Sequence, residues 1–466
     1  MYEDLADFSI GFLQKKGVDY AEARLETTTS TGMVLKDSNP EITGFDQSSG
    51  LGVRYLFKKN MGFISINDLE KRKIHDQLEN SLRITEKASK ISEPFELAHH
   101  KGIKKKNKVT QKQNIADFSQ EEKLKILKEL DKTLKCEHKY ITLSDDINEK
   151  YYVNTEGSQI SSTIPRINFM YFLTLIEGDK SIQRYQQKGA ASGYEALKTW
   201  NLSSEIQKEI EALRSNLKNA VAPPKNKEID IVTAPEVTGI AVHEACGHPT
   251  EADRIFGREA AQAGESFVEE GMIGSKIGSE NVTIVDDPTL ENSYGYYLYD
   301  DEGVKARERV LYKNGLINEF LHNRETAKRM NIKSNGSARA NSYSNEPIVR
   351  MANTFLKAGK SSEEELIKET KKGVYIKNFM EWNIDDKRYQ QKYVGNEAYL
   401  IENGEITKPV RNPALELTTP KLWSSIDLIA NNLKLFAGTC GKGEPMQGIP
   451  VLMGGPSIRL RNIKLS

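Results

Sequence analysis

The 466-residue sequence is poor in cysteine and has no excess of charge of either sign. Cysteine occurs only as Cys136, Cys246 and Cys440, an odd and sparse set that argues against a framework of disulfide bonds and leaves thiols for metal binding or core packing. Lys plus Arg and Asp plus Glu both number 66, so the chain as a whole exerts no electrostatic attraction on nucleic acid or on an anionic membrane. We therefore expect no nucleic acid and no membrane among its partners.

Long apolar runs are also missing. None approaches the roughly 20 residues that span a bilayer, and the longest apolar stretch, between Ile167 and Ile176, is interrupted by Asn168 and suits a strand. The residues that follow Met1 lack the basic start and the continuous apolar stretch of a signal peptide. With 38% hydrophobic residues the composition is that of a folded chain, and we expect a cytoplasmic protein.

The sequence patterns predict an α+β fold in two domains. Residues 1–222 alternate helical periodicity with β-branched and aromatic runs that glycines interrupt, a pattern typical of helices and antiparallel hairpins. Two prolines in the segment 222–225 are typical of a linker. Residues 226–466 are predicted to be predominantly β, with one metal-binding helix. Glycine-centred hairpins are predicted at Asn314-Gly315 and Asn403-Gly404.

Between Lys101 and Gln113 the sequence carries six lysines and few apolar residues. Such a cluster could bind phosphate groups. No aromatic residues that would stack on bases are interleaved with the lysines. We therefore favour a solvated loop for this segment.

A helix-start signal precedes the motif that carries the chemistry. Thr233 and Glu236 have the spacing of a capping box, and Pro235 suits the first helical turn. At the end of the predicted helix stands the sequence His-Glu-Ala-Cys-Gly-His, in which His243 and His248 are five residues apart.

Five residues of regular α-helix turn by about 500°, which would leave the second imidazole roughly 140° from the first. Chelation of one metal ion by both rings therefore requires a break in the helix. Gly247 loosens the backbone, and Pro249 disfavours the α conformation at His248. A wide turn of the π type, with i to i+5 hydrogen bonding, would also bring the two rings together.

Two histidines do not hold zinc tightly, so a third ligand is required. Cys440 lies between glycines in a segment that we expect to be a flexible loop, which would allow the thiolate to approach a metal closely. Cys246, three residues after His243, is expected to pack in the core as a small hydrophobic residue. Without a metal, the two histidines would be hydrogen-bonded to the backbone at the end of a helix.

A site formed by His243, His248 and Cys440 would leave a fourth position on Zn²⁺ for water, whose pKa the metal lowers toward ~7. Glu244 is predicted to lie beside the metal without binding it and to act as the general base that passes the water proton to a leaving amine. The expected reaction is peptide hydrolysis. The sequence does not choose among three candidate oxyanion donors: His322, Arg350 and Tyr343.

Several segments, in the same order along nearly the whole chain, resemble the TldD/PmbA family of metallopeptidases, and in particular its TldD-like branch, which keeps the metal motif. They are Ala21–Glu26, Gly52–Arg54, His243–His248, Asp300–Gly303, Arg350–Thr354, Glu397–Gly404 and Thr439–Lys442.

The resemblance implies a zinc-dependent peptidase with His243, His248 and Cys440 as metal ligands and Glu244 as catalytic base. It implies that extended or unfolded peptides are matured or degraded inside an enclosed cavity. It also implies a PmbA-like (TldE-like) subunit as partner in a heterodimer, with a homodimer as the alternative. We expect the C-terminal domain to perform catalysis and the N-terminal domain to help form the dimer and the cavity.

Two other functions are compatible with the sequence. One is a non-catalytic interaction subunit with a structural zinc, closed by a fourth protein ligand such as Glu244 or Cys246. The other is a hydrolase of non-peptide amides, which would use the same metal chemistry.

Overall fold

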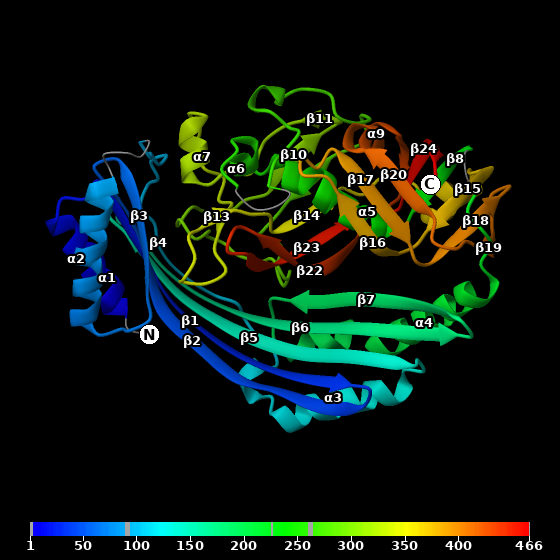
Figure 1. Ribbon diagram of the computed structural model, residues 1–466, viewed down its shortest axis with the longest axis horizontal. Coiled ribbons are helices and arrows are strands. Elements are labelled where there is room, and N and C mark those ends of the chain that lie inside the picture. Colours follow the sequence, from blue (N-terminus) through cyan, green and yellow to red (C-terminus); the bar gives the residue numbers. More distant parts are fainter. Residues whose placement is uncertain (1–2, 89–93, 225–226, 260–263, 466) are drawn as a thin grey trace.

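A long, curved sheet underlies the molecule, and a body of smaller sheets lies on its concave side (Figure 1). The computed structural model describes residues 3–88, 94–224, 227–259 and 264–465. Residues 225 and 226, at the end of the predicted linker and the start of the predicted second domain, lie outside the described residues. Helices and strands occur in both parts, so the predicted α+β fold is confirmed, whereas the division into two domains stays a prediction.

The long sheet has, within the described residues, seven strands in the order β3-β2-β1-β5-β6, with β4 and β7 both paired to the far edge of β6. All neighbours except β4 are antiparallel, as the hairpin pattern predicts. The strands are β1 (Tyr20–Lys36), β2 (Asn39–Phe57), β3 (Asn60–Ile66), β4 (Lys104–Lys108), β5 (His138–Asn154), β6 (Gln159–Glu177) and β7 (Lys180–Ala190).

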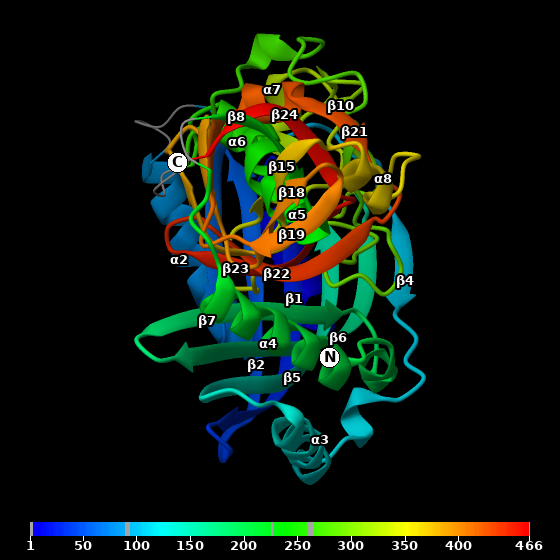
Figure 2. The ribbon, with the colours of Figure 1, turned by 90° about the vertical axis from the view of Figure 1, so that its right-hand side faces the viewer.

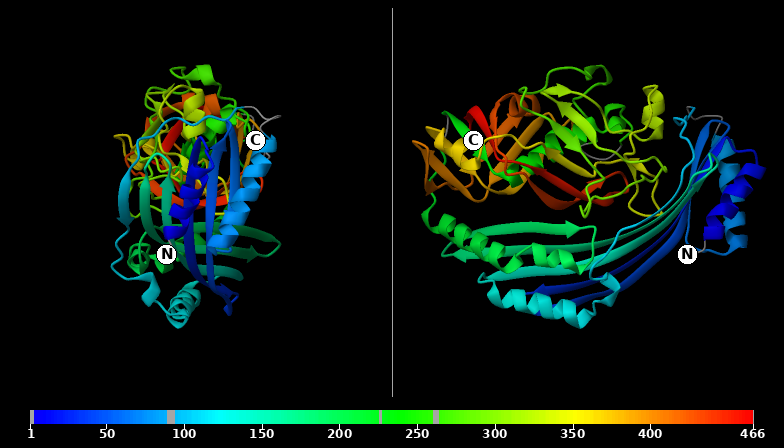
Figure 3. Two further views of the ribbon diagram at one scale, coloured as in Figure 1. Left: turned by 90° about the vertical axis from the view of Figure 1, so that its left-hand side faces the viewer. Right: turned by 180° about the vertical axis from the view of Figure 1, so that it is seen from behind.

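Helices cover the convex face of this sheet, one pair at each end (Figures 1 and 3). Their buried leucine and isoleucine side chains pack on strand residues in two hydrophobic clusters, as amphipathic helices do. None of the described helices combines the length and the apolar character that a membrane crossing requires. The elements are α1 (Glu3–Lys15) and α2 (Lys71–Ala88) at one end, and α3 (Gln120–Thr133), α4 (Leu202–Asn219) and the 3-10 turns η1 (Ile115–Asp117) and η2 (Tyr194–Thr199) at the other.

The lysine-rich segment between Lys101 and Gln113 is not a loop throughout, so that prediction is wrong in part. Lys104–Lys108 form strand β4, which pairs with β6 in parallel. Backbone hydrogen bonds make this strand, and they do not depend on the side chains. The lysine side chains of β4 are exposed, and charged residues of this kind protect an edge strand from pairing with other chains.

The second body surrounds helix α5, which packs against strands β14, β22 and β23 (Figure 1). One six-stranded sheet has the order β11-β10-β9-β14-β23-β22, and another has the order β19-β18-β15-β8-β24-β21. A three-stranded sheet, β16-β17-β20, and the pair β12-β13 complete the body. The predicted hairpins at Asn314-Gly315 and Asn403-Gly404 join β10 to β11 and β18 to β19, and all four residues have positive φ.

The bounds of these strands are β8 (Glu228–Thr233), β9 (Ile284–Asp286), β10 (Arg309–Lys313), β11 (Leu316–Ile317), β12 (Ala338–Arg339), β13 (Ile348–Val349), β14 (Asn353–Leu356), β15 (Lys372–Ile376), β16 (Phe379–Ile384), β17 (Gln390–Gly395), β18 (Ala398–Glu402), β19 (Glu405–Pro409), β20 (Ala414–Thr418), β21 (Ile426–Ile429), β22 (Lys434–Lys442), β23 (Gln447–Gly455) and β24 (Ile458–Lys464). The helical elements are α5 (Pro235–Val242), the π turn η3 (His243–Gly247), η4 (His248–Thr250), α6 (Ala252–Ile255), η5 (Glu270–Met272), α7 (Arg324–Arg329), α8 (Glu363–Lys368) and α9 (Thr419–Ser424).

Buried charged side chains join the long sheet to the second body. Arg54 of β2 contacts Glu22 at 2.8 Å and, across the junction, Glu302 at 2.5 Å. Arg324 of α7 donates a hydrogen bond to the Tyr20 hydroxyl at 2.6 Å. Strand β22 of the second body also lies beside β7 of the long sheet (Figures 1 and 2). These contacts fix the two parts relative to each other, and the candidate site lies where β22 meets β7.

Candidate metal centre

Helix α5 starts one residue later than a capping box at Thr233 would require. Its N-cap is Ala234, whose methyl group cannot accept a hydrogen bond from the backbone. Pro235 lies in the first turn, as predicted. Thr233 instead shares a hydrogen bond with Thr238, while the Glu236 carboxylate accepts two bonds of 2.7 Å from Arg184. The predicted capping box is therefore wrong, because a guanidinium from strand β7 is a stronger partner for Glu236 than a backbone amide.

The helix widens into a π turn at the two histidines. The backbone N–H of His248 donates to the carbonyl of His243, an i to i+5 bond, and the ring centroids lie 4.7 Å apart. The π turn that the spacing suggested is thus confirmed. His248 itself keeps α-helical angles, φ −62° and ψ −42°, so the expected unwinding before Pro249 is wrong. Gly247 serves close packing instead, because a Cβ there would lie 1.9 Å from the sulfur of Met351.

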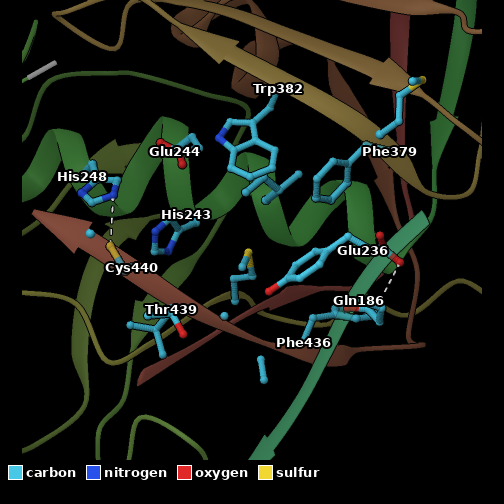
Figure 4. A pocket seen from close by; sticks show the side chains of 18 of the residues that line it. Gln186, Glu236, His243, Glu244, His248, Phe379, Trp382, Phe436, Thr439 and Cys440 are labelled. Carbon is cyan, nitrogen blue, oxygen red and sulfur yellow. Dashed lines mark hydrogen bonds between the residues drawn. The ribbon is translucent and has the colours of Figure 1, made fainter. Parts of the chain in front are cut away.

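Cys440 completes a cluster of three potential metal ligands. One ligand atom from each of His243, His248 and Cys440 can be chosen so that all lie within 4.8 Å of one another, and Cys440 Sγ is 3.4 Å from His248 Nε2 (Figure 4). All three residues are buried. Cys440 does not lie in a flexible loop, as its glycine neighbours suggested, but in β22, where it pairs with Ile449 of β23. The sulfur is therefore held by a regular strand.

A buried carboxylate orients the second imidazole. Glu251 Oε2 lies 2.8 Å from Nδ1 of His248 and also contacts Arg254 at 2.7 Å and Lys442 at 3.3 Å. Burial alone would raise the pKa of Glu251, but Lys442, His248 and Arg254 hold it well below its ordinary value. An ionised Glu251 accepts the Nδ1–H, which leaves the lone pair of Nε2 facing Cys440. The sequence analysis missed Glu251, although its position three residues after His248 was a usable signal.

The electrostatic environment favours a thiolate at Cys440. Burial by itself raises the pKa of the thiol, but the two imidazoles and the guanidinium of Arg350 lower it well below its ordinary value. The interaction is mutual, because Cys440 raises the pKa of His243 despite the opposing effect of burial. The thiolate is the form of cysteine that binds metals.

Cys246 has the opposite environment. It belongs to the largest hydrophobic cluster of the second body, and burial raises the pKa of its thiol well above the ordinary value. The expectation that Cys246 packs in the core is confirmed.

Glu244 points into the same cavity and forms a short ion pair with Nη1 of Arg388. Burial raises the pKa of Glu244, but Arg388 and the two imidazoles outweigh burial and lower it. Glu244 is therefore a carboxylate at neutral pH, as a general base must be. Arg388 lies in the turn between β16 and β17, 144 positions along the chain from Glu244, and no local sequence signal marks it.

The three predicted oxyanion donors do not line this cavity. His322 bonds to Thr326, and burial lowers the pKa of its imidazole to about 4. Arg350 donates to the carbonyls of Gln447 and Cys440. The ring of Tyr343 lies against the β2 backbone, where Gly50 leaves room for it.

The cavity has a volume of about 420 Å³ and lies between the long sheet and the second body. Polar groups that could act chemically gather on its α5 and β22 side, and aromatic side chains form much of the remaining wall (Figure 4). The aromatic residues are Phe172 and Tyr185 from the long sheet and Phe379, Trp382 and Phe436 from the second body. The Glu244 carboxylate, the three potential metal ligands and an apolar wall therefore share one cavity.

Three family models, described as PmbA/TldA metallopeptidase domain 1, central domain and C-terminal domain, match residues 21–91, 113–216 and 226–466, respectively. A metalloprotease from Methanocaldococcus jannaschii is 32% identical over 445 residues, which cover 95% of this chain and 96% of that protein. A zinc metalloprotease TldD homolog from Saccharolobus solfataricus is 25% identical over 459 residues, 97% of each chain. The crystal structure of TldE from Thermococcus kodakarensis matches with a TM-score of 0.74 at 19% identity and covers 100% of this chain and 99% of that one, which shows a shared fold.

Proposed function

Because the chain belongs to the PmbA/TldA metallopeptidase family, we propose that it is a zinc-dependent peptidase that hydrolyses extended or unfolded peptides. The observation that carries this proposal is the convergence of His243, His248 and Cys440 in the cavity that also holds the Glu244 carboxylate. In the proposed site the first three residues hold the metal, and Glu244 is the general base.

The chemistry of the donor set fits zinc. Two neutral imidazoles and one thiolate are nitrogen and sulfur ligands that Zn²⁺ prefers. The 3.4 Å between Cys440 Sγ and His248 Nε2 agrees with the roughly 3.5 Å that separates two tetrahedral ligands of one zinc ion. Within the described part of the chain, Nδ1 of His243 is buried without a hydrogen-bond partner, so one nitrogen atom of this ring is not used in a hydrogen bond. When bound, zinc would polarise the scissile carbonyl and lower the pKa of a water molecule.

The side chains of the protein then supply binding and proton transfer. Glu244, ionised beside Arg388, accepts the proton of the water that attacks the scissile carbonyl and returns it to the departing amine. The aromatic wall excludes bulk water and receives apolar side chains of the substrate. A cavity of about 420 Å³ has no room for a folded domain, so the substrate enters as an extended or unfolded segment.

The geometry gives little support to a purely structural zinc. A closed structural site needs a fourth protein ligand, and the candidates were Glu244 and Cys246. Glu244 pairs with Arg388, and Cys246 lies in the hydrophobic core, where it interacts with Tyr312. Among the described residues the ligand cluster contains three members, which is the number that an open catalytic site has.

We also propose a PmbA-like (TldE-like) subunit as the partner, with a homodimer as the alternative. The shared fold with TldE supports the idea that two related chains can pair. Separation of the purified chain by mass, alone and mixed with such a subunit, distinguishes the two assemblies. The cytoplasmic location stays a prediction.

Removal of the metal should abolish peptide hydrolysis. We expect about one zinc per chain by elemental analysis, loss of activity on an unfolded peptide after treatment with a chelator, and recovery after addition of Zn²⁺. A folded protein that contains the same peptide should resist cleavage, and a non-peptide amide tests the alternative substrate class. Hydrolysis that persists in metal-free protein would contradict the proposal.

Replacement of Glu251 by glutamine should weaken zinc affinity by about 10- to 100-fold, because the carboxylate that orients His248 is lost. Competition with a chromophoric chelator measures the affinity. Asp253→Asn is the matched control, since Asp253 contacts Lys442 in the same network at 2.7 Å but bonds to neither ligand imidazole. Equal affinities of the two variants would show that Glu251 has no orienting role.

A further inference from the structure

Arg388 is a cationic residue that lines the cavity and has no role in the proposed reaction. It lies in the turn between β16 and β17, its side chain is only 7% exposed, and it lines the same cavity as Glu244 and the three ligand candidates. A cation buried this close to a predicted metal site is costly unless an anion compensates it. The carboxylate of Glu244 is one such anion.

The backbone holds Arg388 in an unusual conformation. Its φ is +59°, in the left-handed region that residues with a side chain rarely adopt. Its carbonyl accepts hydrogen bonds from Gln391 at 2.9 Å and Thr419 at 2.8 Å, and its N–H donates to Asp385 at 3.0 Å. Such strain persists where the surroundings enforce it and is common at functional sites. The turn therefore directs the guanidinium into the cavity.

The guanidinium is only partly used by its contact with Glu244. A guanidinium has five N–H donors. In Arg388, Nη1 donates a hydrogen bond to the carboxylate of Glu244. The Nε atom is buried without an acceptor in the described part of the chain. A buried N–H donor without an acceptor costs free energy. This donor belongs to the side chain that pairs with the proposed base, and amide hydrolysis forms a second anion, on the carbonyl oxygen, near that base.

We propose that Arg388 is a catalytic residue that donates hydrogen bonds to the oxygen of the scissile carbonyl as that oxygen becomes an oxyanion. The proposal rests on the proposed peptidase function. It replaces His322, Arg350 and Tyr343, which do not line the cavity.

The charges balance in each step. The water oxygen forms a bond to the carbonyl carbon, the π electron pair moves onto the carbonyl oxygen, and the water proton goes to Glu244. Glu244 becomes neutral as the oxyanion appears, so the hydrogen bonds of Arg388 pass from the carboxylate to the new anion. The C=O bond then re-forms, the C–N bond breaks with its electron pair on nitrogen, and that nitrogen takes the proton from Glu244. An interaction that is strongest in the transition state raises kcat.

The test compares Arg388→Gln with the unaltered protein, both loaded with zinc. A phosphinic peptide, which carries an anionic oxygen in place of the oxyanion, and the corresponding peptide substrate are the two probes. We expect kcat to fall by about 10²–10³-fold, and calorimetry should show a similar loss of affinity for the phosphinic peptide. KM should change little, and zinc content should stay the same.

Lys387→Gln is the matched control. Lys387 is the neighbouring residue in the same turn, its side chain is 65% exposed, and its Nζ lies 3.9 Å from the carboxylate of Glu265. This variant should keep the affinity for the phosphinic peptide, the KM for the peptide substrate and kcat. Arg388→Lys keeps the charge without the planar fork and should lose roughly ten-fold in affinity for the phosphinic peptide; it carries the test if the glutamine variant does not fold.

Unchanged affinity for the phosphinic peptide in the Arg388 variants would overturn the proposal, even with reduced kcat, because Arg388 would then only position Glu244. Loss of zinc from these variants would also overturn it, since the residue would then support the metal site. Failure of the peptidase function itself is distinguishable, because the unaltered protein would then neither hydrolyse the peptide nor bind its phosphinic analogue.

Discussion

Replacement of Glu244 by glutamine should lower kcat for peptide hydrolysis by about 10²–10⁴-fold and leave the zinc content unchanged. Glutamine has nearly the same shape, and its amide oxygen can still accept the hydrogen bond of Arg388. It cannot take up a proton, so the water loses its base and the amine loses its acid. Steady-state kinetics on an unfolded peptide, together with elemental analysis, measure both quantities.

Two comparisons make this result specific. Glu244→Asp keeps the carboxylate but withdraws it by one methylene group, so it should retain more activity than the glutamine variant. Thermal unfolding shows whether the buried pair with Arg388 also contributes to stability, because loss of its charge leaves a guanidinium in a buried site. Full activity in the glutamine variant, or release of its zinc, would favour the non-catalytic subunit with a structural metal.

Replacement of Cys440 by alanine should remove bound zinc and, with it, all measurable peptidase activity. The substitution deletes the sulfur from the cluster of three potential ligands, and two histidines alone hold zinc weakly. We expect the zinc affinity to fall by more than about 10²-fold, a larger loss than for an orienting residue such as Glu251. Chelator competition and elemental analysis are the measurements.

The other two cysteines are matched controls. Cys246→Ala removes a sulfur that is three residues from His243 but packs in the core, and it should keep its zinc with a stability loss of about 1 kcal/mol. Cys136→Ala changes a partly exposed thiol outside the second body and should behave like the unaltered protein. Zinc retained by the Cys440 variant and lost by the Cys246 variant would reverse the proposed ligand assignment.

Local patterns allowed the main elements of the fold to be predicted. The hairpins at Asn314-Gly315 and Asn403-Gly404 were predicted because two adjacent residues with positive φ favour Asn-Gly. The five-residue spacing of the histidines predicted a break in the helix, and the break is a π turn. In each case the residues that decide the structure are neighbours in the chain.

Features that depend on distant partners were missed or wrong. Glu236 faces Arg184 rather than a capping position, and the lysines of β4 belong to a strand because β6 offers a free edge. Cys440 is held by pairing with β23, which its flanking glycines did not reveal. Arg388 reaches Glu244 only through the folded turn between β16 and β17. The structure brings the predicted ligands together, whereas their roles stay predictions.

The walls of the cavity come from both halves of the chain. The shape of one wall can therefore change in evolution without a change in the proposed catalytic residues. The proposed ligands and base all come from the second body, whereas Phe172 and Tyr185 come from the long sheet. Under the proposed function, substitutions along β6 and β7 would therefore change which peptides the cavity binds, while the proposed ligand atoms stay unchanged. The substrate preference could therefore vary without loss of the proposed catalytic residues, because the two parts of the molecule contribute different walls of the cavity.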